Sequence, residues 1–392
     1  MSYQENGKGI LGLHKNVFSA GLVSFFMDFS SEMVYPLVPL FLATILGVNK
    51  SIIGIIEGIA ESTASLLKVF SGWFSDRIGK RRFLMVGGYG VSTLSRPFVA
   101  LSTHWGHVLT YRFIDRFGKG IRTAPRDAII AESSPEVHLG RSFGFHRAMD
   151  TVGAVVGPAT AFLLLSLFSN SYRLVFWVSM IPGILAIMII VLFITEKKGK
   201  RGLVTLPKLS LKDFDYRFKA FIFVITLFAL GNSSDAFLIL RAQNLGIKIA
   251  VIPLVYLSFN VVYALFAWPA GILSDKIGPR KVILSGFILF ALIYLGFALA
   301  QNPTHIWMLF PLYGIFMGLT EGVQKAYLAT IIPHTHKATA YGIYNSLIGL
   351  AVLPASIMGG YLWDTICPSA TFYYGAIVAS FSALLFIFLL KK

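Results

Sequence analysis

The chain has 392 residues, of which 56% are hydrophobic and only 13% are charged, and its formal net charge is +16. A soluble protein of this length would need far more polar surface to cover its core, so the composition excludes an ordinary soluble protein. The bases sit in short loops between apolar runs, which argues against a nucleic-acid-binding protein. The one cysteine, Cys367, excludes an internal disulfide and a multi-cysteine metal site.

Apolar runs of about 20 residues follow one another along the chain, and each is long enough to cross a lipid bilayer. We therefore expect an all-α membrane protein with twelve transmembrane helices. The predicted spans are 17–46, 51–74, 83–103, 106–130, 142–167, 172–195, 219–245, 250–274, 281–300, 305–332, 340–363 and 371–390.

Lysine and arginine are distributed unevenly between the loops on the two sides of these spans. An even number of spans places both termini on one side of the membrane. The loops on that side hold most of the bases, whereas the opposite loops offer little beyond Lys50, Arg173 and Lys248. Short cytoplasmic loops carry an excess of lysine and arginine, so the sequence predicts a multi-pass protein of the cytoplasmic (inner) membrane with both termini in the cytoplasm.

One loop motif occurs twice, after the second span and again 199 residues later, after the eighth. It consists of a glycine, three residues, an aspartate, a base, one residue, a second glycine, one residue and two bases. The glycines allow a tight turn, and the aspartate can cap a helix start or accept charge-assisted bonds. The motif residues are Gly72, Asp76, Arg77, Gly79 and Arg81 in the first copy, and Gly271, Asp275, Lys276, Gly278 and Arg280 in the second.

This doubled motif resembles the loop signature between helices two and three, and between helices eight and nine, of the major facilitator superfamily. The resemblance implies two six-helix bundles related as parallel repeats, with spans one, four, seven and ten lining a central site. We accordingly expect an N-terminal bundle over 1–196, a cytoplasmic linker over 197–217 and a C-terminal bundle over 218–392. The motif aspartates would meet the opposite half, Asp76 on span eleven and Asp275 on span five.

The fifth span carries Gly144, Gly153, Gly157 and Pro158. Glycines let helices pack closely, and a proline bends a helix or frees a carbonyl. The spacing resembles the glycine-rich fifth-helix signature of superfamily members that exchange substrate for protons. The family pattern ends in a glycine pair, which Ala161 and Phe162 replace here. The alternative interpretation is that these small residues only pack two helices together.

Charged residues at membrane depth are costly and usually mark a transport pathway or a buried partner. Asp28 and Glu32 in span one, and Glu57 and Glu61 in span two, each lie one helical turn apart and so share a face. We predict that one of these four carboxylates binds and releases a proton in the transport cycle, because burial disfavours its charged form. Glu61 and Asp28 are the preferred candidates.

Span four carries five bases within an arc of about 120° around the helix. They are Arg112, Arg116, Lys119, Arg122 and Arg126. Arg116 lies four residues before Gly120, which resembles the superfamily's fourth-helix pattern, where the arginine is associated with proton transfer or substrate contact. The stripe could attract an anion, or the acids of spans one, two, four and five could neutralise it. The first-half spans hold eight bases and seven acids, and this near balance favours an internal network.

The two halves also correspond at membrane depth. Ser30, Ser31 and Glu32 are echoed by Ser233, Ser234 and Asp235, and Glu61 falls opposite Asn260. The candidate cavity residues are Arg112, Arg116, His146, Asp150, Asp235, Asn260, Glu321 and Lys325.

No Gly-Lys-Ser/Thr motif supports an ATP-driven pump, and no His-Glu-x-x-His or serine-elbow pattern supports an enzyme. We expect a secondary transporter that moves a small organic solute by alternating access, coupled to protons, with export favoured. The alternative is an importer of an anionic solute such as an organic acid or a carboxylate-type siderophore, and a remote one is a non-transporting membrane sensor. The expected partners are the substrate, protons and the bilayer. We expect a monomer with no cofactor, no metal and no nucleic acid.

Overall fold

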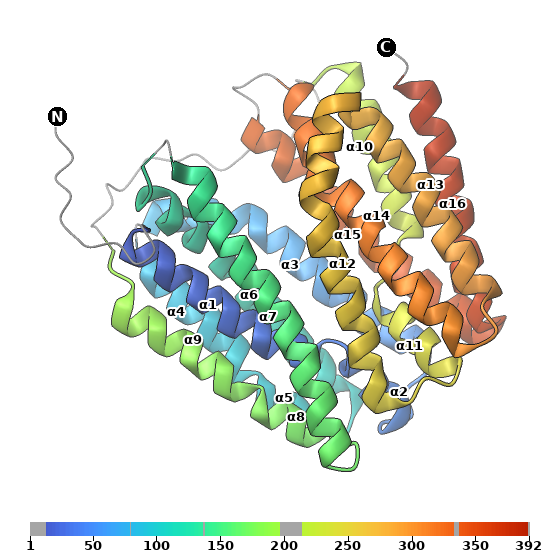
Figure 1. Cartoon of the computed structure of the whole chain (residues 1–392), viewed down its shortest axis with the longest axis horizontal. Coiled ribbons are helices and arrows are strands. Elements are labelled where there is room, and N and C mark those ends of the chain that lie inside the picture. Colours follow the sequence, from blue (N-terminus) through green and yellow to red (C-terminus); the bar gives the residue numbers. More distant parts are fainter. Residues whose placement is uncertain (1–12, 79, 136–137, 197–213, 333–336, 391–392) are drawn as a thin grey trace.

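The computed structural model describes residues 13–78, 80–135, 138–196, 214–332 and 337–390 (Figure 1). These residues fold into helices, and each of the twelve predicted spans corresponds to one helix or to two consecutive helices, which confirms the predicted fold class. The elements are α1 (Lys15–Val34), α2 (Val38–Thr44), α3 (Lys50–Ile78), α4 (Arg81–Leu94), α5 (Arg96–Ala100), α6 (Trp105–Glu132), α7 (Leu139–Leu167), α8 (Tyr172–Val178), α9 (Met180–Phe193), α10 (Tyr216–Gly231), α11 (Ala236–Asn244), the 3₁₀ turn η2 (Ile249–Val251), α12 (Ile252–Ile277), α13 (Pro279–Leu299), α14 (Pro303–Thr330), α15 (Lys337–Thr365) and α16 (Pro368–Leu389).

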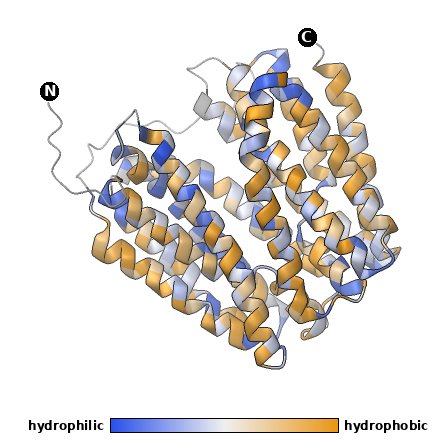
Figure 2. Ribbon diagram, viewed as in Figure 1, coloured by the Kyte–Doolittle hydropathy of each residue, from blue (hydrophilic) through white to orange (hydrophobic). Residues whose placement is uncertain are grey.

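Nine of the spans in the described ranges are long and apolar enough to cross a membrane by length and composition alone. The other three predicted spans, α3, α4 with α5, and α6, include the two most highly charged helices. Figure 2 shows hydrophilic residues along the helices of the first half and at the helix ends, and mostly hydrophobic residues in the second half. Large apolar side chains such as Trp268 and Leu265 are exposed on the outside, where they would contact lipid.

Four spans are broken into two helices, and proline accounts for two of the breaks. Pro36 separates α1 from α2, and Pro97 lies in the first turn of α5. A proline has no N–H to donate, and its ring clashes with the preceding turn. The breaks place the residues just before these prolines, Tyr35 and Arg96, at the inner wall of the protein, where both line the cavity described below.

The two halves meet along two long helix pairs, α3 with α15 and α7 with α12, and along the short pair α2 with α11. A Cβ on Gly54 would lie 2.1 Å from the carbonyl oxygen of Ser356, and one on Gly360 would lie 2.3 Å from that of Lys50. Glycine therefore lets α3 and α15 touch backbone to backbone. Figure 1 shows the bundles closest together at the end opposite the termini and diverging toward the end where α1 begins and α16 ends.

The two loop motifs follow α3 and α12. Asp76 and Asp275 both fall in the last turn of a helix, and their capping role stays a prediction. Gly278 adopts a φ of +91°, which explains a glycine between α12 and α13. The helix pairs match the expectation, since α3 packs on span eleven and α12 on span five. The side chain of Asp76, residue 79 and most of the predicted 197–217 linker lie outside the described part of the chain, so the partner of Asp76 and the domain boundary stay predictions.

Candidate functional site

A central cavity of about 300 Å³ lies between the two halves. The four spans that the resemblance implied, one, four, seven and ten, all contribute side chains, and spans two, three, eight and eleven complete the wall. The lining residues are Asp28, Ser31, Glu32, Tyr35, Glu61, Arg96, Tyr111, Arg112, Asp115, Arg116, Lys119, Asn232, Ser233, Ser234, Asp235, Tyr256, Tyr313, Met317 and Val352.

Two arginines of α6 pair with two glutamates of α3 like successive rungs of a ladder. Arg112 forms an ion pair with Glu57, and both side chains are 2% exposed. One turn further along both helices, Arg116 lies 2.8 Å from Glu61. The shared spacing of four residues is what lets both pairs form at once, because residues four apart lie on one face of a helix.

A third pair joins α5 to α6. The Arg96 guanidinium lies 3.8 Å from the Asp115 carboxylate and donates to Tyr111 and Ser31 at 2.9 and 3.1 Å. Arg96 is 1% exposed, so this pair belongs to the wall of the cavity rather than to its open space. Buried charges require such partners, since an unpaired one would carry a large desolvation cost.

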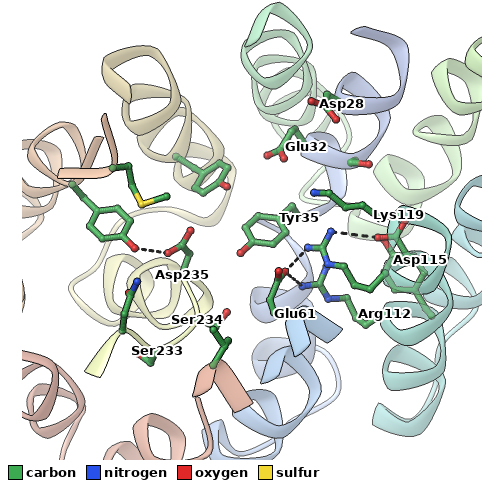
Figure 3. Close-up of a pocket in the computed structure, with 18 of the residues that line it drawn as sticks. Asp28, Glu32, Tyr35, Glu61, Arg112, Asp115, Lys119, Ser233, Ser234 and Asp235 are labelled. Atoms are coloured by element: carbon green, nitrogen blue, oxygen red, sulfur yellow. Dashed lines mark hydrogen bonds and ion pairs between the residues drawn. The ribbon is translucent and has the colours of Figure 1, made fainter. Parts of the chain in front are cut away.

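Four charged residues of the cavity form no ion pair within the described ranges: Asp28, Glu32, Lys119 and Asp235. The Tyr313 hydroxyl donates to Asp235 at 2.8 Å. One carboxylate oxygen of Glu32 is buried with no hydrogen-bond partner. Figure 3 shows Glu32 and Asp235 pointing into the same space from opposite halves. These side chains are therefore the ones available to a ligand or a proton.

The glycines of the fifth span pack directly against the two acids of the first. A Cβ on Gly153 would lie 2.5 Å from the carbonyl oxygen of Phe25 and 3.1 Å from the Cβ of Asp28. One on Gly157 would lie 2.8 Å from the Cβ of Glu32. Gly144 has open space at its Cβ position. Two of the three motif glycines thus fix how closely α7 approaches the acidic face of α1.

The remaining bases of α6 point away from the cavity. Arg122 donates to Ser92 at 2.7 Å and lies over the ring of Tyr89, both on α4. Arg126 pairs with its neighbour Asp127 at 2.9 Å. The stripe predicted from the sequence is therefore divided between the cavity and the α4 side of α6.

Several predicted cavity residues form a second polar group, nearer the end of the protein where α1 begins and α16 ends. Buried His146 lies 2.5 Å from the Ser24 hydroxyl and 3.8 Å from Asp150. Asn260 donates to the carbonyl oxygen of Ala154 at 3.4 Å, and Lys325 lies 3.5 Å from Glu321. None of these five predicted residues lines the cavity.

Arg147 and Tyr263 connect this group across the two halves. Arg147 on α7 donates to the hydroxyl of Tyr263 on α12 at 2.7 Å, and that hydroxyl also bonds Glu321 on α14.

Sequence reasoning did not single out the tyrosines of the cavity. Tyr35, Tyr256 and Tyr313 all line it, yet an aromatic residue in an apolar span is indistinguishable by type from one that faces lipid. The proline after Tyr35 is a local signal, because a span interrupted by proline places its neighbouring side chains irregularly.

The profile of the Major Facilitator Superfamily matches residues 20–240 and 220–392. An uncharacterised MFS-type transporter of Methanocaldococcus jannaschii is 38% identical over 392 residues and 98% of each chain. A multi-drug resistance efflux pump PmrA homolog of Lactococcus lactis is 25% identical, with 89% of each chain covered. A cis,cis-muconate transport protein of Acinetobacter baylyi is 24% identical, with 74% of this chain and 73% of its own length covered.

Solved structures show the same fold. A POT family transporter in complex with 5-aminolevulinic acid superposes with a TM-score of 0.82, covering 98% of both chains at 14% identity. The family profile covers both halves, and the archaeal relative matches over nearly the full length. The chain therefore belongs to the Major Facilitator Superfamily of membrane transporters.

Proposed function

We propose that this protein is a proton-coupled secondary transporter that exports a small organic solute across the cytoplasmic membrane, with both termini in the cytoplasm. The observation that carries the proposal is the set of cavity carboxylates that form no ion pair with any described residue, Asp28, Glu32 and Asp235. A carboxylate in a low-dielectric site without a paired base loses its charge by binding a proton. A site that alternates between the two sides of a membrane can carry that proton across.

Among the four carboxylates predicted to couple, Asp28 suits the role best. Glu57 and Glu61 form ion pairs with Arg112 and Arg116, and breaking these pairs would leave a buried guanidinium without its partner. Asp28 has no such partner in the described ranges and lies against Gly153, at the contact between α1 and α7. Movement of α7 against α1 would change the surroundings of this carboxylate directly.

Two observations support export. The fifth-span glycines resemble the pattern of proton-exchanging members, and one relative is named a multi-drug efflux pump homolog. The alternative function, import of an anionic solute, is favoured by one relative that is named a cis,cis-muconate transport protein. The pairing of Arg96, Arg112 and Arg116 with acids weighs against it, because these bases are already neutralised.

Flux in proteoliposomes tests the proposal. Protein would be reconstituted with an internal pH dye, and benzyltrimethylammonium, uridine and cis,cis-muconate would serve as cationic, neutral and anionic probes. We expect at least one probe to move protons in the opposite direction and to be concentrated by a pH gradient. Asp28→Asn should abolish that concentration but retain exchange of probe for probe. Glu132→Gln, which removes an acid at the end of α6 that is 58% exposed, is the matched control. Normal concentration by Asp28→Asn, Glu32→Gln and Asp235→Asn alike would refute coupling through these residues.

A further inference from the structure

The two walls of the cavity differ in charge. The wall from the second half carries one charged side chain among its described residues, Asp235. The others there are an asparagine, two serines, two tyrosines, a methionine and a valine. An anion would find no base on this wall, whereas a cation would find a carboxylate held in place by Tyr313.

The three arginines of the first-half wall are already paired with acids. Arg96, Arg112 and Arg116 each pair with an acid. The guanidinium groups of Arg112 and Arg116 also lie over the ring of Tyr35, 5.3 and 5.6 Å from its centroid. In Figure 3, Tyr35 lies between Arg112 and Asp235, so its ring separates that arginine from the opposite wall. Their charge is thereby directed toward α3 rather than into the open cavity.

The unpaired charges leave the cavity acidic. When these pairs are set aside, three carboxylates remain against one lysine, Lys119. Two of the three, Glu32 and Asp235, occupy corresponding positions in the two halves, each after a pair of serines. They face one space from opposite sides, and a buried oxygen of Glu32 has no hydrogen-bond partner. A positively charged ligand would satisfy both.

Aromatic rings supply the rest of a cation site. Tyr256 and Tyr313 line the cavity on the same wall as Asp235, and Phe259 packs between them with ring centroids 5.4 Å from each. The face of an aromatic ring carries partial negative charge and therefore attracts an ammonium group. Rings and carboxylates together select an organic cation over a hydrated metal ion, because rings cannot replace water ligands.

We propose that the cavity binds organic cations, with the ammonium group held between Glu32 and Asp235 against the rings of Tyr256 and Tyr313. This inference rests on the proposed function for its setting, since it names the substrate class of the same site. Each half contributes one carboxylate to the site. The ligand would therefore keep a contact with both halves whether the cavity is open to one side of the membrane or to the other. Protonation of Asp28 and its neighbouring cavity carboxylates would release the cation, which is the exchange that export requires.

Equilibrium binding without any gradient tests the ligand class. Protein in nanodiscs would be titrated with benzyltrimethylammonium, its neutral carbon analogue neopentylbenzene, and phenylacetate. We expect saturable binding of the cation, at least tenfold weaker binding of the neutral analogue, and none of the anion. Asp235→Asn keeps an acceptor for Tyr313 and should weaken cation binding at least tenfold, as should Glu32→Gln. Glu132→Gln, outside the cavity, should leave binding unchanged.

The ligand class is overturned by tighter binding of phenylacetate, by equal binding of the neutral analogue, by absence of saturable cation binding, or by unchanged binding in Asp235→Asn. The probe series on the unaltered protein decides the question even if a variant fails to fold. Intact cation binding without gradient-driven flux would refute the proposed proton coupling alone. Gradient-driven flux of an anion would refute the ligand class alone.

Discussion

At the scale of single residues, the buried pair of Arg112 and Glu57 shows how the protein tolerates charge at membrane depth. Each side chain is 2% exposed, so neither is solvated by water. Their mutual attraction offsets much of the cost of removing both from water. The pair is therefore a condition of folding rather than a free binding group.

Arg112→Ala should lower the free energy of unfolding by about 3–5 kcal/mol, because it leaves the Glu57 carboxylate buried and uncompensated. Thermal unfolding in detergent would measure the loss. The double variant Arg112→Met with Glu57→Met should recover most of it, since it removes both charges and keeps the volume. Glu132→Gln, which breaks a pair between half-buried Arg81 and exposed Glu132, should change stability by less than about 1 kcal/mol. Equal losses in Arg112→Ala and Glu132→Gln would contradict this account.

The sequence predicts which charged residues share a helix face, but it does not predict which of them pair across helices. Helical periodicity alone places Glu57 with Glu61 on one face, and Arg112 with Arg116 on another. Which face meets which depends on the rotation of α3 and α6 about their own axes, and the whole bundle sets that rotation. Lys119 is on the same stripe as the paired arginines, and nothing in its spacing reveals that it forms no ion pair with the described residues.

At the scale of elements, α7 illustrates a motif whose members do different things. Gly153 and Gly157 meet the backbone of α1, whereas a Cβ on Gly144 would have nothing within 4 Å. Two glycines of the motif, Gly153 and Gly157, are therefore needed for helix contact, whereas the position of Gly144 has space for a side chain.

Gly157→Ala should push α1 away from α7 and reduce both stability and transport, because the added carbon would lie 2.8 Å from Phe29 and Glu32 atoms. We expect a loss of about 1–3 kcal/mol, the usual cost of overpacking. Gly144→Ala is the matched control on the same helix and should be neutral or slightly stabilising, since alanine favours helix. Thermal unfolding and proton-driven flux of both variants would decide. If the two variants behave alike, the contact with α1 is not the reason for the motif.

The elements themselves were largely predictable. All twelve predicted spans reappear as helices, and nine of them in the described ranges are long and apolar enough to cross a bilayer. The division of four spans into two helices was not predicted. Proline marks the breaks at Pro36 and Pro97, but α7, α12, α14 and α15 each continue through an internal proline. The surrounding packing decides whether a proline bends a helix or ends it.

At the scale of the whole molecule, one carboxylate joins the halves at the end opposite the termini. Asp364 on α15 accepts hydrogen bonds from the backbone N–H groups of Lys50 and Ser51, at 3.1 and 2.7 Å, and from the Ser51 hydroxyl at 2.7 Å. It thus caps the start of α3 from the other bundle. Because the cap forms only while this end is closed, it stabilises the state seen in Figure 1.

Asp364→Ala should shift the population toward the state open at this end, by about 0.5–2 kcal/mol, the usual value of a helix cap. Spin labels at Thr103→Cys and Gln301→Cys, both exposed on this face, would report the distance between the halves. Cys367→Ser removes the exposed native thiol. Ser51→Ala loses only the hydroxyl contact and should have a smaller effect. An unchanged distance distribution in Asp364→Ala would show that the cap does not contribute to closure.

The backbone contact between α3 and α15 also acts as a pivot. Beside the cavity, Ser62 donates to the carbonyl oxygen of Gly349 at 2.5 Å, and a Cβ on Gly58 would lie 2.9 Å from the Cα of Leu353. At 1.5 Å per residue, the 29 residues of α3 form a rod about 43 Å long. A rotation of about 15° about its middle would swing each tip by roughly 6 Å, while atoms near the middle barely move. A molecule bound beside this pivot can thus keep its contacts while the cavity closes to one side of the membrane and opens to the other.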